Sequence, residues 1–421
     1  MTPLKTITLH ELSAHPAVPV DAQAEAIARD IINDVGARGI DAVLEYAVRF
    51  GDIAKGAAPV LSPAALKAAH DALPEETRAL LHRTAERIKT FANAQRNALA
   101  ELTLDIPGGQ VGHNLAPVER AGCYAPSGRF PLPSSVLMTA VTARCAGVSE
   151  VWLASPKPDT LTMAAAHVAG VDGFLAVGGA QAIAALALGA GEVPKVDVIV
   201  GPGNKYVTAA KKLVSGQVAI DMLAGPSELT VLADDTADPD VVAWDLLAQA
   251  EHDDDAIPVL VTTDATLPAR VNDALVRHLA TLPTAATARR ALQNGFALIA
   301  DTLDDAIRAC DILAPEHLEV QTRHAEAVAA RCQHYGGLFI GAGAAEVLGD
   351  YGAGPNHTLP TGGTARYTGG LSVFHFIRIR TWMRIGDPSA ARAMATDAAA
   401  LAKLEGLAAH AQSAACRTKS D

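Results

Sequence analysis

The spacing of apolar residues divides the chain into a helical first part and a later part in which strands and helices alternate. Residues 22–49 and 63–101 place apolar side chains at helical spacing among charged ones, which predicts amphipathic helices. From Ala121 onward, short apolar runs alternate with alanine-rich stretches. We therefore expect mostly helical structure over the first hundred residues and α/β structure after them.

The later part contains two series of strand–helix pairs. The expected strands are 151–154, 174–177, 196–200, 229–233, 259–262 and 297–300, and the helices that follow them are 161–168, 180–188, 204–214, 239–252, 269–282 and 304–313. Asp238 is a candidate N-cap, because Pro239 suits the first position of a helix. Such alternation predicts two α/β units with parallel sheets and helices on their faces. The alanine-rich tail from about Gly386 predicts further helix.

Composition narrows the class of protein. A chain of 421 residues is too long for one simple domain. Its net charge of −12 and the lack of a basic run argue against nucleic-acid binding and favour small-molecule substrates. The longest uncharged run, 173–191, contains five glycines and is not expected to span a membrane.

The ends and the cysteines predict a cytoplasmic protein. The N-terminus lacks the apolar core of a signal peptide. The five cysteines are odd in number, scattered and without a CxxC pair, which favours reduced thiols over disulfides or a thiolate zinc site.

Gln249 and His252 lie three positions apart in an expected helix, so their side chains would share one helical face. An amide oxygen and an imidazole placed in this way can hold one metal ion. An ordinary helix end with polar residues is the more common cause of such spacing. The remaining chemistry of the chain has to decide between them.

Two later segments carry groups suited to catalysis. Glu316 and His317 follow Pro315, and we expect this proton-transferring pair at a loop or helix start. The glycine-rich stretch 349–357 bears a carboxylate, a phenol, an amide and an imidazole, a combination typical of a site. Gln249, His252, Asp350 and His410 would form a nitrogen and oxygen ligand set that suits zinc better than calcium or magnesium, although an amide ligand is unusual for zinc.

Glycine-rich turns after expected strands could approach a ligand closely. Gly178-Gly179-Ala180-Gln181 and Gly201-Pro202-Gly203-Asn204 stand where a helix begins, and Gly225-Pro226-Ser227-Glu228 precedes a strand. Each is equally compatible with a plain tight turn. None matches the GxGxxG dinucleotide fingerprint.

These blocks, in this order along most of the chain, resemble the histidinol dehydrogenase family. The matching blocks are 177–187, 200–204, 220–222 with 224–228, 249–252, 314–318, and 349–351 with 356–357 and 359–361. The resemblance implies oxidation of L-histidinol to L-histidine with NAD and a zinc ion. It also implies an intertwined homodimer whose subunits contain two incomplete Rossmann-like domains with parallel-rich sheets and small helical N- and C-terminal segments. The missing fingerprint is no contradiction, because this family binds NAD without it.

The same resemblance implies domains and site residues. The expected domains are 1–16, 17–123 with 234–371, the NAD-contacting 124–233, and 372–421, which reaches the partner subunit. The expected zinc ligands are Gln249, His252, Asp350 and His410, the catalytic pair is Glu316 and His317, the NAD contacts are Tyr124, Gln181 and Asn204, and the other substrate contacts are Ser227, His357 and Glu405. In this scheme His317 accepts the hydroxyl proton and Glu316 activates a water. Zinc orients the substrate.

Two departures keep alternatives open. The segment 125–135 differs from the family's usual sequence there, and 367–373 with Thr381-Trp382 also resembles relatives such as sulfopropanediol 3-dehydrogenase. A zinc- and NAD-dependent enzyme for another primary alcohol is therefore the main alternative. A zinc hydrolase using Glu316, or a non-catalytic protein stabilised by metal, would be different classes.

Overall fold

The computed structural model describes residues 4–12, 20–127 and 131–417. The chain forms two compact units. The larger comprises Met1–Ala94 with Val118–Phe376, and the smaller comprises Gln95–Pro117 with Ile377–Asp421. Residues 128–130 of the atypical segment 125–135 lie outside the described residues.

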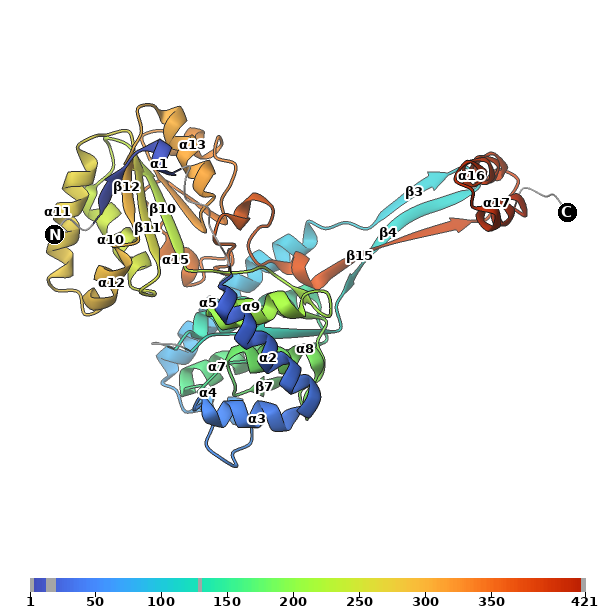
Figure 1. Ribbon diagram of the computed structural model, residues 1–421, viewed down its shortest axis with the longest axis horizontal. Helices are drawn as coiled ribbons and strands as arrows, with labels where there is room; N and C mark the ends of the chain where they lie inside the picture. The colour runs from blue at the N-terminus through green and yellow to red at the C-terminus, as the bar shows by residue number, and fades with distance from the viewer. Residues whose placement is uncertain (1–3, 13–19, 128–130, 418–421) are drawn as a thin grey trace. The chain divides into compact units, whose positions relative to one another are not determined.

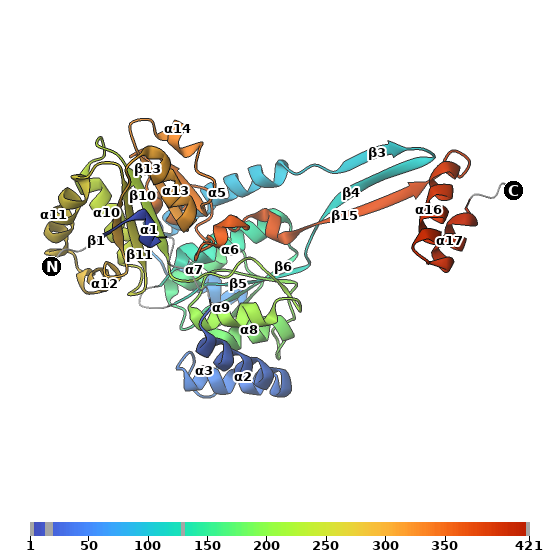
Figure 2. The same ribbon diagram turned by 45° about the horizontal axis from the view of Figure 1, so that its top comes forward.

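One six-stranded sheet of the larger unit, here called the β10 sheet, is parallel throughout. Its strand order is β1 (Lys5–Ile7), β12 (Phe296–Ile299), β11 (Ile257–Thr262), β10 (Glu228–Ala233), β13 (His317–Gln321) and β14 (Gly337–Ile340). Helices α10 (Pro239–Ala250), α11 (Leu267–Leu279) and α12 (Ala285–Ala291) cover one face, and α1 (Leu9–Leu12), α13 (Leu303–Leu313) and α14 (Ala325–Ala329) cover the other (Figures 1 and 2). Both faces are apolar because both are covered.

The second six-stranded sheet, here called the β5 sheet, is parallel except for one edge strand. Its order is β2 (Val60–Leu61), β7 (Gly173–Leu175), β6 (Glu150–Ala154), β5 (Arg120–Tyr124), β8 (Val198–Val200) and β9 (Ala219–Ile220), with β2 antiparallel to β7. Helices α2 (Ala22–Arg38), α3 (Ile40–Arg49), α8 (Gly179–Leu188) and α9 (Lys205–Val214) share its main core. Helices α4 (Pro63–Asp71), α5 (Glu75–Asn97), α6 (Pro133–Ala146) and α7 (Thr160–Ala169) complete the helices of this half.

The smaller unit joins an antiparallel sheet to two helices. The sheet has the order β15 (Ile377–Ile385), β4 (Gly109–Pro117) and β3 (Leu102–Ile106), and the helices are α16 (Arg392–Leu404) and α17 (Ala408–Ala415) (Figure 1). The helical tail is therefore confirmed, whereas the three strands are absent from the sequence-based expectation. The expected helical stretch 63–101 forms two helices, α4 and α5, and ends at Asn97, and the stretch 22–49 is interrupted at Gly39.

The predicted α/β class with two parallel-rich sheets is confirmed. The grouping of segments differs from the predicted domains. Residues 17–123 were predicted to join 234–371, but helices α2 and α3 and strand β5 from this stretch belong with the β5 sheet. Strand β10 lies within the predicted domain 124–233, but it belongs with the β10 sheet. The predicted and observed groupings differ because strands pair and helices pack across long sequence separations, which local patterns do not reveal. Strand β4 likewise pairs with β15, and β3 pairs with β4, so both strands belong to the sheet of the smaller unit and not to the first domain.

All five cysteines are free thiols. Among the described residues, no helix is both long enough and apolar enough to cross a membrane.

Candidate functional site

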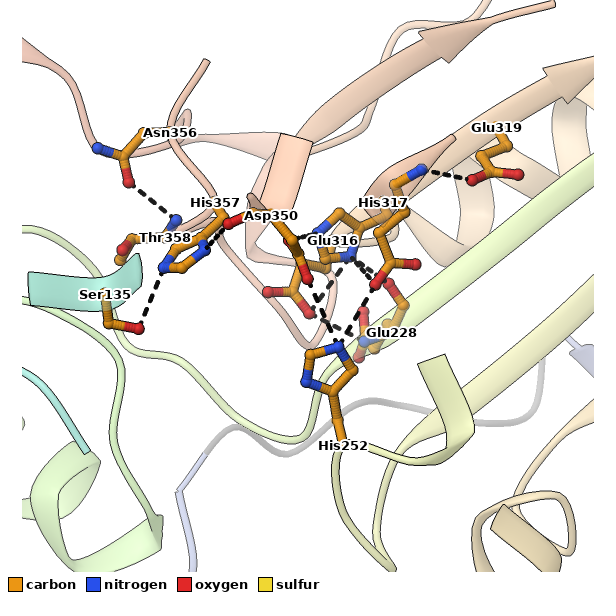
Figure 3. Close-up of polar contacts among 11 residues, drawn as sticks. Ser135, Glu228, His252, Glu316, His317, Glu319, Asp350, Asn356, His357 and Thr358 are labelled. Atoms are coloured by element: carbon orange, nitrogen blue, oxygen red, sulfur yellow. Dashed lines mark hydrogen bonds and ion pairs between the residues drawn. The ribbon is translucent and has the colours of Figure 1, made fainter. Parts of the chain in front are cut away.

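The candidate site lies at the amino ends of strands β10 and β13 in the β10 sheet, where α10 and the short helix α15 (Glu346–Asp350) also end. Figure 3 shows the side chains of His252, Glu316, His317 and Asp350 converging there. Parallel α/β sheets more often bind ligands at the carboxyl ends of their strands. Here the opposite edge carries the titratable groups.

Pro315 shapes the backbone that leads into the expected catalytic pair, Glu316 and His317. Helix α13 ends at Leu313, and Ala314 takes a left-handed conformation with φ 47° and ψ 58°. A residue before proline avoids the right-handed helical region, and a left-handed alanine is strained. Glu316 lies in the bend after Pro315, within the expected loop, whereas His317 is the first residue of strand β13 and not part of a loop or helix start.

His317 is a neutral imidazole with one free nitrogen. Its Nδ1 lies 3.0 Å from the carbonyl oxygen of Glu228, and a carbonyl can only accept, so Nδ1 carries the proton. Nε2 is buried, has no hydrogen-bond partner among the described residues, and lies 3.8 Å from Oδ1 of Asp350. Burial lowers the pKa of His317 to about 4. The free lone pair on Nε2 is that of a general base.

Glu316 is held beside this imidazole by the backbone. Its Oε2 accepts a 2.9 Å hydrogen bond from the amide of Glu228 and lies 3.7 Å from Nδ1 of His317. Burial raises the pKa of Glu316 well above its usual value. Ser227 contributes a hydrogen bond to the carboxyl group of Glu316, which places this predicted substrate contact at the same edge.

His252, Glu346 and Asp350 form a cluster able to hold a metal ion, with one ligand atom from each lying within 4.8 Å of the others. Nε2 of His252 lies 3.5 Å from Oδ2 of Asp350 and 3.9 Å from Oε1 of Glu346. Burial opposes ionisation of Asp350, yet the hydrogen bond with His252 and the nearby imidazoles hold its pKa below the usual range.

Gln249 fits a metal site for a different reason. Its side chain is fully buried, and neither its amide oxygen nor its amide nitrogen has a hydrogen-bond partner in the described part of the chain. A buried amide without partners is costly unless a ligand satisfies it. Helix α10 begins as predicted, with Asp238 capping and Pro239 first, but it ends at Ala250, so His252 lies in the following turn and not on the helix.

A polar network stands behind the cluster. Alternate residues of β13 point the side chains of His317, Glu319 and Gln321 to one face. Nε2 of Gln321 donates to Glu319 at 2.9 Å and to Asp245 of α10 at 2.7 Å. Burial, followed by Asp245, raises the pKa of Glu319 to about 8. Oε1 of Glu319 accepts from the amide of Glu346 at 2.7 Å, and this bond positions α15.

His357 and Asn356 connect this edge to the β5 half of the same unit. Nδ1 of His357 donates to the carbonyl of Asp350 at 3.0 Å, and its Nε2 lies 3.1 Å from the hydroxyl of Ser135 in α6 (Figure 3). The side-chain amide of Asn356 donates to the carbonyl of Met138, also in α6, at 2.8 Å. The expected substrate contact His357 is therefore fixed beside Asp350.

The predicted NAD contacts lie at the carboxyl ends of the β5-sheet strands. The hydroxyl of Tyr124 accepts from the amide of Gly179 at 3.1 Å. Nε2 of Gln181 donates to Asp52 at 3.4 Å, and Asp52 also accepts from the amide of Gly178 at 3.0 Å. Asn204 caps α9 by accepting from the amides of Tyr206 and Val207. Tyr124 and Gln181 are buried, so their role as NAD contacts stays a prediction.

Glycine is required at the turn after β8. Gly201 has φ 116°, and a Cβ there would lie 2.0 Å from the carbonyl oxygen of Tyr124. Its amide donates to Asp221 at 2.7 Å, and its carbonyl accepts from Lys211 at 2.8 Å. Lys211 and Asp221 form a buried ion pair. This pair fixes the turn that leads to Asn204.

The structure brings most expected site residues together and assigns two to the other unit. Glu405 ends α16 and His410 lies in α17, both in the smaller unit. Sequence reasoning missed Glu346 and Glu319, and it named Glu228 only as part of a turn that could approach a ligand. The alternation of polar side chains at 317, 319 and 321 could have indicated Glu319, and the four-residue spacing of Glu346 and Asp350 could have indicated a shared helical face.

Comparison with known proteins covers the whole chain. The family model described as histidinol dehydrogenase matches residues 17–418. The histidinol dehydrogenases of Syntrophotalea carbinolica and Thermus thermophilus are 43% and 42% identical, over 98% and 95% of this chain and 96% of each relative. The crystal structure of histidinol dehydrogenase from Elizabethkingia anophelis superposes with a TM-score of 0.92 at 31% identity, covering 99% of this chain and 98% of that one. The chain is therefore an oxidoreductase of the histidinol dehydrogenase family.

Proposed function

We propose that this enzyme oxidises L-histidinol to L-histidine through the aldehyde, with two NAD as electron acceptors and a zinc ion at Gln249, His252 and Asp350. His410 of a partner subunit completes the ligand set in an intertwined homodimer, as the resemblance implies. The observation that carries the proposal is the free Nε2 of the neutral His317 beside this ligand cluster. The compartment proposed is the cytoplasm.

The residues fit the ion by their chemistry. A buried amide without partners, an imidazole and a carboxylate are nitrogen and oxygen donors of the kind that zinc accepts. When bound, the ion would hold the imidazole and amine of the substrate and so orient its alcohol carbon. NAD, which takes the hydride, would be contacted by Tyr124, Gln181 and Asn204.

His317 performs the first proton transfer in this scheme. Its Nε2 accepts the hydroxyl proton of the substrate while hydride leaves the same carbon. The bond from Nδ1 to the carbonyl of Glu228 holds the tautomer that leaves Nε2 free. Burial keeps the ring neutral at physiological pH, since its pKa lies at about 4.

Glu316 serves the second oxidation. The aldehyde must add water before a second hydride can leave, and a carboxylate with a raised pKa is a better base for that water. Overall, one alcohol, one water and two NAD⁺ give one carboxylate, two NADH and three protons. Ser227, His357 and Glu405 are the proposed contacts to the substrate.

Steady-state NADH formation tests this proposal. L-histidinol and sulfopropanediol are compared as substrates, with and without NAD, and we expect two NADH for each histidinol consumed. Turnover of sulfopropanediol alone would favour the related alcohol dehydrogenase. Turnover of a hydrolysable ester or amide without nicotinamide would favour a zinc hydrolase. The variant Glu326→Gln, at an exposed glutamate of α14, is the matched control for Glu316→Gln.

A further inference from the structure

We propose that Asp52 makes this enzyme select NAD over NADP, because its carboxylate accepts a hydrogen bond from the adenosine ribose of NAD and repels the 2′-phosphate of NADP. The inference deepens the proposed function and rests on it for the identity of the dinucleotide. The expected NAD contacts Tyr124, Gln181 and Asn204 do not include Asp52.

The strand order of the β5 sheet marks where a dinucleotide would bind. Strands β6 and β7 lie on one side of β5, and β8 and β9 lie on the other, so the order reverses between β5 and β8. Open α/β sheets bind ligands outside the carboxyl ends of their strands at such a reversal. Tyr124 ends β5, and Asn204 follows β8. In dinucleotide-binding folds the carboxylate that bonds the adenosine ribose comes from the side of the second strand, which here is the side of β6 and β7.

Asp52 reaches this side from a distant part of the chain. It lies in the loop between α3 and β2, and β2 pairs with β7. Its Oδ2 accepts from the amide of Gly178 at 3.0 Å and from Nε2 of Gln181 at 3.4 Å, just beyond the carboxyl end of β7. Its other oxygen, Oδ1, accepts no hydrogen bond from the residues that the structure describes, and the side chain is half-buried. A ribose hydroxyl can therefore donate to Oδ1.

The turn beside Asp52 disfavours a phosphate group. In the glycine fingerprint, free amides at the start of a helix bind the pyrophosphate. Here α8 begins at Gly179, but the amide of Gly178 bonds Asp52 and the amide of Gly179 bonds the hydroxyl of Tyr124. The helix dipole stabilises the Asp52 carboxylate at this position, and the charge of the carboxylate repels an anion. The turn thus suits a neutral hydroxyl group, which also explains why it lacks the fingerprint.

Lys157 provides an opposite charge close to the same loop. It follows β6, is exposed, and holds a left-handed conformation with φ 45°. Its Nζ lies 3.7 Å from the position that a Cβ on Gly51 would occupy, so the ammonium group is beside the backbone that leads into Asp52. A lysine at such a place attracts phosphate groups. Without the charge of Asp52, Lys157 would favour NADP, and Asp52 therefore sets the direction of the preference.

Binding of NADH and NADPH to the full-length protein tests the inference without an alcohol substrate. The fluorescence of the bound nicotinamide gives both dissociation constants for wild type, which should bind NADH more tightly, and for each variant. Asp52→Asn keeps an oxygen that can accept from Gly178 but loses the charge. The ratio of the NADPH to the NADH dissociation constant should therefore fall at least ~10-fold, as expected for a hydrogen bond to a charged group.

Matched variants separate the charge of Asp52 from other effects. Asp41→Asn removes an exposed acid of α3 and should change the ratio by less than about twofold. Lys157→Met, added to Asp52→Asn, should weaken NADPH binding again. Circular dichroism confirms that each variant is folded, and Asp52→Ser, which also keeps an acceptor, replaces Asp52→Asn if that variant does not fold.

The ratio distinguishes selection from a structural role. An unchanged ratio in Asp52→Asn, or an equal loss of affinity for both dinucleotides, would show that Asp52 only holds the turn and would overturn the inference. Tighter binding of NADPH by wild type would overturn it as well. Selective NADH binding without histidinol oxidation would count against the proposed function alone, whereas failure to bind either dinucleotide would count against both.

Discussion

One turn of the β5 sheet and one end of the β10 sheet differ in how their buried polar side chains are satisfied. At the carboxyl edge of the β5 sheet, Lys211 pairs with Asp221, and both bond the turn at Gly201. At the amino edge of the β10 sheet, the side chains of Gln249 and Glu346 and Nε2 of His317 are buried without hydrogen-bond partners among the described residues. Paired groups hold a backbone in place, whereas unpaired buried groups cost stability. The difference indicates that the chain itself fixes the turn at Gly201, whereas the buried groups at the β10 edge have hydrogen-bonding capacity left for a ligand.

The largest effect is expected from the unpaired imidazole. Replacing His317 by Asn removes the proposed base, and kcat for histidinol oxidation should fall about 10²- to 10⁴-fold. The exposed His324 of the same unit provides the control His324→Asn, which should keep near-normal activity. Stopped-flow and steady-state NADH formation measure both. A His317→Asn variant within tenfold of wild type would remove His317 from the mechanism.

Breaking the buried Lys211–Asp221 pair of the β5 sheet should lower the free energy of unfolding. Lys211→Met leaves Asp221 buried without its cation and should lower the free energy of unfolding by about 3–5 kcal/mol. Its neighbour Lys212 pairs with Glu25 but is 46% exposed, so Lys212→Met should cost below about 1 kcal/mol. Urea unfolding followed by circular dichroism separates the two. Equal costs for both variants would show that burial of the pair does not matter.

A pH-dependent difference in stability is expected from Glu228, which lies between the proposed catalytic pair and the loop at Gly362. Burial raises the pKa of Glu228 from 4.5 to about 7. A raised pKa gives stability that is full below the unfolded value and is lost as the pH rises through the folded value. Wild type should therefore lose up to about 3 kcal/mol between pH 4.5 and 7 from this group.

Glu228→Gln should remove that loss. The difference in free energy of unfolding, variant minus wild type, should increase from pH 4.5 to 7 and stay constant above pH 7. A constant difference between the two proteins from pH 4 to 8 would show that Glu228 does not titrate abnormally.

The smallest effect is expected for Gln249→Leu, which should stabilise the metal-free protein. Gln249→Leu removes a buried amide that has no hydrogen-bond partner in the described part of the chain, so in metal-free protein it should raise the free energy of unfolding by about 1–3 kcal/mol. Gln321→Leu removes an amide that donates to Asp245 and Glu319, and it should lower stability by a similar amount. Thermal unfolding in the presence of a chelator measures both. Loss of stability in both variants would mean that Gln249 is satisfied in the metal-free protein.

Local patterns predicted much of the larger unit. The cap at Asp238 and the apolar runs of the strands followed from neighbouring residues. Strand order did not follow, because β1 pairs with β12 and β10 with β13 across long stretches of chain. The antiparallel strand β3 had a readable alternation in Leu102, Leu104 and Ile106, but no element was predicted for it or for β15, which lie just outside the predicted helical stretches.

Only the site residues that belong to recognisable sequence motifs were predicted. Glu316, His317, His252 and Asp350 do meet at one edge. Glu346 lay in an unremarkable short helix, and its importance comes from burial beside His252, which no local spacing reveals. Glu228 of β10 contacts Glu316 and His317 only because β10 and β13 lie side by side in the sheet. Glu319 of β13 in turn accepts from the amide of Glu346.

The most direct test of the account is histidinol oxidation by protein freed of metal. The same sample is assayed for NADH formation with L-histidinol before and after one equivalent of zinc is added. We predict negligible activity without zinc, full recovery with it, and two NADH for each histidinol. Undiminished oxidation by fully stripped protein would contradict the claim that the unpaired groups of the β10 edge are built around an ion.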